Sequence, residues 1–295
     1  MDNLLNNFVK RGLITPPSFV PDGIQYLCIH GSHAYGTNNE ESDFDIAGIT
    51  IPPKTIIFPH LAGEIAGFGT SEERFELWEK AHIMNPDNKT EYDFQIYSIV
   101  RFFHLLLMNN PNIIGMLFVP KNCILKITEI GKLILENRKL FLHKGSFYRY
   151  KGYAYSQVSK LKSQRREGRR APIVAKFGYD LDFAYNCVRL LNEIEQILLE
   201  GNLDLQRNKE QLKSIRRGEW LLEDVLDYFT KKESLLEKAY IDSQLPNYPD
   251  EEKIKALLLL CLEQHFGSLD NHVVTDSLYT KGLQEIKAIL DRLGV

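Results

Sequence analysis

The sequence predicts an α+β protein in which a mixed β-sheet domain, residues 1–124, precedes a helical domain, residues 125–295. Two observations predict this division. Segments of alternating or β-branched apolar residues, which are typical of strands, occur in the first part. From residue 125 onward the apolar residues instead recur at the helical period of about 3.6. The length of 295 residues suits two domains of moderate size.

The first domain is predicted to combine three strands with a few short helices. Glycine and proline signals set the boundaries: a proline pair ends the second strand, and an Asn-Pro step restarts a helix. The polar region 63–89 is interpreted as a long loop or irregular hairpin. The predicted elements are a helix over 4–12, strands over 24–30, 43–51 and 92–97, and helices over 98–108 and 111–118.

The second domain is predicted to be entirely helical. Gly201, Gly218 and the Leu245-Pro246 step separate its periodic segments. No internal repeat is visible, which argues against a solenoid. The predicted helices span 126–137, 146–164, 176–200, 208–214, 222–240 and 251–265.

Composition limits the possible partners and the compartment. With a formal net charge of -3 and a pI near 6.3, the chain has no global attraction to nucleic acid or membrane, so a polyanion must be held by a local patch. The four cysteines are dispersed and form no CxxC or Cys/His cluster, which argues against a zinc site or a disulfide framework. Without a signal pattern or an apolar stretch of about 18 residues, the expectation is a soluble cytoplasmic protein.

Asp43 and Asp45 stand two residues apart near the start of the second predicted strand. Because side chains alternate along a strand, these carboxylates point to one side while Phe44 and Ile46 point into the core. Asp93 lies near the start of the third strand. Three acidic positions on neighbouring strands predict a site for one or two Mg²⁺ or Mn²⁺ ions, which prefer oxygen ligands and share them with nucleotide phosphates.

A Gly31-Ser32 turn precedes the aspartate pair. Its backbone N–H groups are able to face a phosphate, and glycine permits close approach. An Asp-x-Asp pair alone is common on solvent-facing strands and in Asx turns, so by itself it indicates only an acidic surface. The order of strand, Gly-Ser turn and Asp-x-Asp strand is more restrictive, and it predicts phosphoryl or nucleotidyl transfer at a two-metal site.

Residues 28–49 resemble the signature of the DNA polymerase beta-type nucleotidyltransferase superfamily, in which Gly-Ser precedes Asp-x-Asp and a third acidic residue follows on another strand. The segments Gly31–Thr37, Asn110-Pro111-Asn112 and Ile215-Arg216-Arg217-Gly218-Glu219 are similar to those of the predicted nucleotidyltransferases named RNA-ligase-associated polymerases. This likeness extends from about residue 24 to 246. It implies a polymerase beta-like palm followed by a helical domain that binds nucleotide and acceptor.

The resemblance also implies roles for individual residues. Glu91 lies two residues from Asp93 on the same strand face, and it would be the third carboxylate if the strand register differed. Around residues 182–189 the chain departs from the family pattern, because Asp182 and Asn186 occupy spacings where lysine and histidine are common. The implied metal ligands and catalytic carboxylates are Asp43, Asp45 and Asp93, and the implied nucleotide-binding residues are Gly31, Ser32 and Tyr35.

Basic residues in the second domain are candidates for contacts with phosphate. A cation from a second domain commonly completes a triphosphate site, which makes Lys176 and Arg189 candidates, with ordinary surface charge as the alternative for each. Residues 160–170 hold six basic residues in eleven, with four tyrosines just upstream, a pattern suited to RNA or triphosphate binding. Solvated helix ends have the same composition. The predicted acceptor-binding residues are Arg165, Arg166, Arg169 and Arg170, whereas Arg216, Arg217 and Glu219 are interpreted as a helix cap and ion pair.

The predicted function is metal-dependent transfer of a nucleoside monophosphate from a triphosphate to a hydroxyl, with release of pyrophosphate. The favoured acceptor is an RNA end, tRNA included, because of the basic segment and the resemblance. One alternative is transfer to a protein hydroxyl, as in toxin-neutralising minimal nucleotidyltransferases. Another is a non-catalytic nucleotide-binding protein, which the three intact acidic positions argue against. A nuclease is not supported, because no histidine or lysine base stands beside the aspartate pair.

Overall fold

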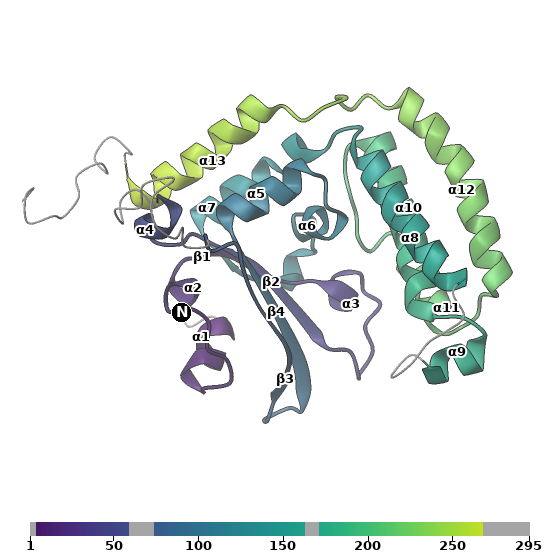
Figure 1. Ribbon diagram of the computed structural model, residues 1–295, viewed down its shortest axis with the longest axis horizontal. Coiled ribbons are helices and arrows are strands. Elements are labelled where there is room, and N and C mark those ends of the chain that lie inside the picture. The colour runs from purple at the N-terminus through teal and green to yellow at the C-terminus, as the bar shows by residue number, and fades with distance from the viewer. Residues whose placement is uncertain (1–3, 59–73, 163–170, 268–295) are drawn as a thin grey trace, which may run out of the picture.

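The computed structural model describes residues 4–58, 74–162 and 171–267. This part of the chain contains a five-stranded sheet with the strand order β3-β4-β2-β1-β5 (Figure 1). The β2–β4 pair is parallel, and the other neighbours are antiparallel. The fold is α+β, as predicted. The strands are β1 Ile24–Ile29, β2 Phe44–Thr50, β3 Leu77–Asn85, β4 Thr90–Ser98 and β5 Ile124–Ile127.

Helices cover both faces of the sheet (Figure 1). On one face the first helix packs against the central strands, and Phe8 makes edge contacts with the rings of Tyr92 and Phe94 at 4.9 and 5.2 Å. On β2, Ile46 faces this core and Ala47 faces the opposite one, as the period-two alternation requires. The covering helices are α1 Leu4–Lys10 and α2 Phe19–Asp22 on the first face, and α5 Ile99–Leu107, α6 Pro111–Met116 and α7 Glu129–Glu136 on the second.

Most of the remaining helices form a second layer beside the sheet, whereas α3 and α13 contact the sheet domain itself. α10 is central and contacts α8, α11 and α12, whereas α13 returns across the sheet domain to contact α5 and α7 (Figure 1). Among the described residues, no helix has both the length and the apolar content needed to cross a membrane. The helices are α3 Gly31–Ala34, α4 Lys54–Ile57, α8 Ser146–Lys162, α9 Ala171–Phe177, α10 Leu181–Glu200, α11 Lys209–Arg216, α12 Leu222–Asp242 and α13 Glu251–Phe266.

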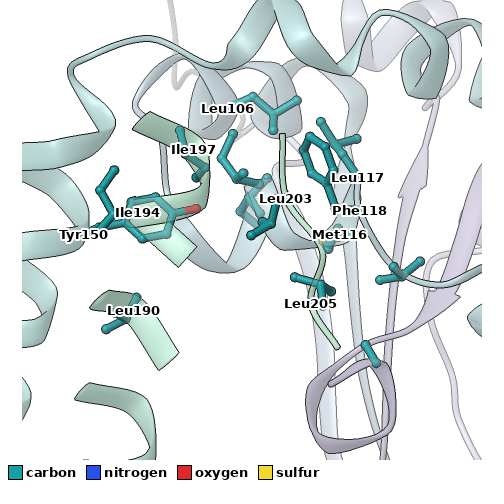
Figure 2. Close-up of a cluster of buried hydrophobic side chains, with 14 of the residues drawn as sticks. Leu106, Met116, Leu117, Phe118, Tyr150, Leu190, Ile194, Ile197, Leu203 and Leu205 are labelled. Atoms are coloured by element: carbon teal, nitrogen blue, oxygen red, sulfur yellow. The ribbon is translucent and has the colours of Figure 1, made fainter. Parts of the chain in front are cut away.

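One hydrophobic core extends from the sheet into the helical layer. Ile194 and Ile197 of α10 belong to the same buried cluster as Leu106 of α5 and Phe118, which follows α6 (Figure 2). The predicted division between residues 124 and 125 falls at the first residue of β5, a strand that pairs with β1. The division stays a prediction, but the last strand of the sheet lies beyond it.

Helix ends follow the local sequence. The Asn110 side chain accepts hydrogen bonds from the N–H groups of Asn112 and Ile113, with proline at the first helical position, as predicted. The predicted helix over 176–200 is confirmed from Leu181 onward, but its start is wrong, because Gly178 adopts a φ of +82° and Asp180 caps a new helix by accepting from the N–H of Asp182. The structure therefore has α9 and α10 in its place.

Two strands differ from the prediction. Residues 77–85, predicted as loop or irregular hairpin, form the edge strand β3. Most of its side chains are exposed, so the sequence lacks the alternation that marks a half-buried strand. The predicted helix over 126–137 is confirmed only in part, because residues 124–127 form the short strand β5 and α7 begins at Glu129, after the cap Thr128.

Candidate nucleotidyl-transfer site

Three carboxylates meet where two parallel strands lie side by side. The register of β2 against β4 places Asp45 directly opposite Asp93. Asp43 precedes β2 by one residue, on the same face as Asp45. One ligand oxygen from each of these three residues lies within 4.8 Å of the others. The structure thus brings the predicted metal-ligand set together, in a geometry suited to a shared divalent cation.

Asp93 is held in place by a bulge in the edge strand. The register of β3 against β4 shifts between Lys80 and Ile83, and His82 within the bulge adopts a φ of +58°. Its backbone N–H donates to Asp93 Oδ1 at 2.7 Å, and its ring Nδ1 lies within hydrogen-bond distance of Glu91 Oε1. Asp93 therefore completes the cluster with Asp43 and Asp45. The Glu91 carboxylate instead contacts the His82 ring.

Gly31 permits the close approach of the turn to the metal-facing carboxylate. Its φ is +55°, and a Cβ at this position would lie 1.7 Å from Asp45 Oδ2. The preceding residue ties the turn to the strand, because the His30 N–H donates to the Asp45 carbonyl oxygen at 2.7 Å. Only glycine combines this backbone conformation with the space that the carboxylate needs.

The electrostatics of the cluster disfavour three ionised carboxylates. Burial raises the pKa of Asp45 from its ordinary value of 3.8 to about 6, with further increases from Asp43 and Asp93. The cation Arg216 lowers this pKa in part. A divalent cation would remove the repulsion, so the residues present fit a metal ion by their chemistry as well as by their positions.

The carboxylates line a cavity of about 650 Å³ between the sheet and α10. Its walls carry five carboxylates and two guanidinium groups, and burial lowers the pKa of His30 to about 4, so this histidine is neutral near pH 7. An anionic ligand would meet net repulsion here unless cations accompanied it. The charged lining residues are Glu41, Asp43, Asp45, Asp93, Asp182, Arg189 and Arg216.

Ser32 is a buried polar group that faces the same cavity. Its side chain is 7% exposed, and its Oγ has no hydrogen-bond partner among the described residues. Its carbonyl oxygen accepts from the Thr37 N–H at 2.9 Å, which closes the turn. Buried hydroxyls are nearly always satisfied, so this one is available for a ligand in the cavity.

Tyr35 and Arg189 both line the cavity, but they also belong to a buried network. The Arg189 guanidinium donates to the Tyr35 hydroxyl at 2.7 Å and to Glu193 Oε1 at 3.0 Å, and the Tyr35 hydroxyl donates to the same oxygen at 2.7 Å. Further bonds go to Asn112 and Asn186. The nucleotide-binding role of both residues stays a prediction. Their hydrogen bonds hold the turn that carries Tyr35 against α10.

Other predicted contacts lie elsewhere. Lys176 is exposed, stands 4.8 Å over the ring of Phe177 and is not among the residues that line the cavity. Of the upstream tyrosines, Tyr150 is fully buried and Tyr155 bonds to Glu233 of α12. The basic acceptor-binding candidates Arg165, Arg166, Arg169 and Arg170 lie outside the described residues.

Arg216 lines the cavity, a position that sequence reasoning missed. It ends α11, and its guanidinium carbon lies 4.5 Å from the centre of the Tyr185 ring, which also lines the cavity. The adjacent Arg217 is exposed and pairs with Glu219, as predicted. The interpretation of Arg216 as part of the same surface cap and ion pair is wrong, because it faces the cavity. Because the two arginines are adjacent at a helix end, the sequence does not indicate which one faces the cavity and which one forms a surface ion pair.

The parallel strand pair with three carboxylates and the Gly31-Ser32 turn agree with the polymerase beta-type nucleotidyltransferase signature that the sequence resembles. Within this class, the model of the family described as "RlaP: RNA repair pathway DNA polymerase beta family" matches residues 12–246. The chain belongs to this family, as its sequence motifs predicted.

Individual relatives add less. The chain is 30% identical over 132 residues, or 44% of its length, to the "Uncharacterized 38.9 kDa protein in nrdC-mobD intergenic region" of Enterobacteria phage T4. This match spans only 36% of that relative. A crystal structure of a nucleotidyltransferase-like protein from Exiguobacterium sibiricum 255-15 aligns over 98% of this chain and 90% of that chain, with 9% identity and a TM-score of 0.29. A similarity at this TM-score does not assign a fold or a function to the chain.

Proposed function

We propose that the protein transfers a nucleoside monophosphate from a nucleoside triphosphate to a terminal hydroxyl of RNA, tRNA ends included, and releases pyrophosphate. The observation that carries this proposal is the carboxylate cluster, whose ligand oxygens lie within 4.8 Å of one another, beside the buried and unpartnered Ser32 Oγ. Cation ligands and a phosphate-facing hydroxyl in one cavity suit a metal-bound triphosphate.

The reaction exchanges one bond at the α-phosphorus for another. The acceptor oxygen forms the new bond to this phosphorus, the bond to the bridging oxygen of the β-phosphate breaks, and pyrophosphate leaves with the electron pair. Two Mg²⁺ or Mn²⁺ ions, when bound, would supply acidification of the acceptor hydroxyl and neutralisation of the leaving group. Asp43, Asp45 and Asp93 would hold these ions, and a carboxylate of this cluster would receive the hydroxyl proton.

The protein's own contribution is position and charge. The Gly31-Ser32 turn would present N–H and hydroxyl groups to the triphosphate, and the bulge at His82 keeps the Asp93 carboxylate oriented toward the cluster. RNA as the acceptor is supported by the family description and by the basic residues over 160–170. Metal dependence is supported by the excess of carboxylates in the cavity wall.

A labelling screen tests the proposal. The protein is incubated with each α-labelled ribonucleotide or deoxyribonucleotide and Mg²⁺ or Mn²⁺, against RNA, tRNA, DNA and cell lysate. We expect label in RNA ends and none with the double variant D43N/D45N. The matched control is Asp87→Asn, an exposed aspartate that pairs with Arg11 outside the cavity. A fully active double variant would refute the site, and label confined to lysate proteins would refute the RNA acceptor.

A further inference from the structure

The cavity contains an arginine with a buried nitrogen that has no hydrogen-bond partner in residues 4–58, 74–162 and 171–267. Its two lining arginines are Arg189 and Arg216. Arg189 donates to four side chains through Nε, Nη1 and Nη2, and it is 4% exposed. The buried Nε of Arg216, in contrast, has no hydrogen-bond partner among the described residues. A buried guanidinium N–H without a partner is costly, so its place in a cavity indicates an anionic ligand.

The position of Arg216 is fixed by Tyr185 rather than by an ion pair. Its guanidinium lies over the Tyr185 ring at 4.5 Å, a contact that holds a cation without neutralising it. The adjacent Arg217 instead donates to both oxygens of Glu219 at the surface. Arg216 thus keeps its charge for the cavity, and that charge acts on Asp45.

The same tyrosine links this cation to the Gly-Ser turn. The Tyr185 hydroxyl and Thr37 Oγ1 lie 3.0 Å apart, and the Thr37 N–H donates to the Ser32 carbonyl oxygen at 2.9 Å. Arg216 Nε and Ser32 Oγ, two of the buried atoms without a hydrogen-bond partner among the described residues, therefore belong to one connected set of contacts, and both residues line one cavity. A ligand that bridges them must be anionic and rich in hydrogen-bond acceptors.

We infer that Arg216 binds the β- and γ-phosphates of the nucleoside triphosphate, the part that leaves as pyrophosphate. The inference rests on the proposed function and adds a residue from the helical part to the triphosphate site. The guanidinium fork matches phosphate oxygens in geometry. There its charge would balance the negative charge that develops on the leaving pyrophosphate.

Pyrophosphate is the sharpest probe, because it is common to all nucleotides and lacks a base. With Mg²⁺ present, we expect Arg216→Gln to weaken binding of pyrophosphate and of ATP roughly 10- to 100-fold, the range for a lost charged hydrogen bond. Binding of AMP should be unchanged. Arg216→Lys should lose less, because it keeps the charge without the fork. Arg217→Gln is the matched control and should bind pyrophosphate as the wild type does.

Three outcomes would overturn the inference. Wild-type affinity of Arg216→Gln for pyrophosphate excludes the contact. Weaker binding of RNA with unchanged binding of pyrophosphate assigns Arg216 to the acceptor instead. Equal losses of pyrophosphate affinity in Arg216→Gln and Arg217→Gln indicate a general effect of charge. Circular dichroism and thermal unfolding establish that each variant is folded. If the wild type binds no triphosphate with any metal, the proposed function itself fails, which is a different result.

Discussion

Replacing Asp45 with asparagine should stabilise the metal-free protein while destroying its activity. The carboxylate is buried beside two others, and its pKa is raised from 3.8 to about 6. Between these values the native state keeps a proton that the unfolded chain has released. Stability therefore falls as the pH rises through this interval, and the full penalty applies above it. The neutral amide, similar in shape, avoids this penalty.

The magnitude follows from the two pKa values. A tenfold change in proton affinity corresponds to about 1.4 kcal/mol, so the difference between 3.8 and about 6 corresponds to about 3 kcal/mol. This figure is an upper limit, because side-chain rearrangement would relax part of the repulsion. We expect Asp45→Asn to gain up to about 3 kcal/mol in free energy of unfolding at pH 7.5, and almost nothing at pH 4.

Urea unfolding in EDTA across pH 4 to 8 measures this difference. A useful comparison is Asp250→Asn, because hydrogen bonds from Lys253 lower the pKa of Asp250 at the start of α13. That variant should be destabilised near neutral pH, and its deficit should shrink as the pH falls. Added Mg²⁺ should stabilise the wild type more than Asp45→Asn. The reasoning is refuted if Asp45→Asn is less stable than the wild type at pH 7.5 in EDTA, or if the difference does not depend on pH.

Further substitutions test the residues that hold the site in position. Gly31→Ala should lower kcat about 100-fold or more, because the new Cβ would lie 1.7 Å from a carboxylate oxygen; near-normal turnover would contradict the geometry. His82→Gly keeps the N–H that orients Asp93 and accepts the φ of +58°, so it should retain activity within a few-fold. His82→Pro removes the N–H and cannot adopt this φ, so it should cost at least about tenfold, and equal activities would exclude the positioning role. Arg189→Leu should lose about 3–5 kcal/mol of unfolding free energy in urea, and a double variant that also changes Glu193→Leu should lose less; an additive loss would argue against a coupled pair.

The parts of the site that are close in sequence were predictable from the sequence alone. Asp43, Asp45 and the Gly31-Ser32 turn are set by strand alternation and by a local turn, which sequence patterns carry. The choice between Glu91 and Asp93 was not predictable in this way, because it depends on the register of β2 against β4. Register is a property of two strands that are distant in sequence.

The features that the sequence did not reveal share a physical cause. The strand β3 lies at an edge with both faces largely exposed, so it has no hydrophobic period. Arg216 and Arg217 have the same chemistry, and only the packing of α11 decides that one faces the cavity and the other pairs with Glu219. Patterns of hydrophobicity report which face of an element is buried, but not which polar residue a second element brings to a cavity.

The turn over residues 31–37 is fastened to helices that lie far along the chain. Tyr35 bonds to Glu193, and Thr37 bonds to Tyr185, both on α10. A fragment ending at residue 124 would keep Asp43, Asp45 and Asp93, yet it would leave the turn without these hydrogen bonds and with Tyr35 exposed. Residues 1–124 are therefore not expected to form the site on their own. Fluctuations that loosen α10 would also loosen the turn, so any ligand held there would slow hydrogen exchange in a helix about 150 residues away.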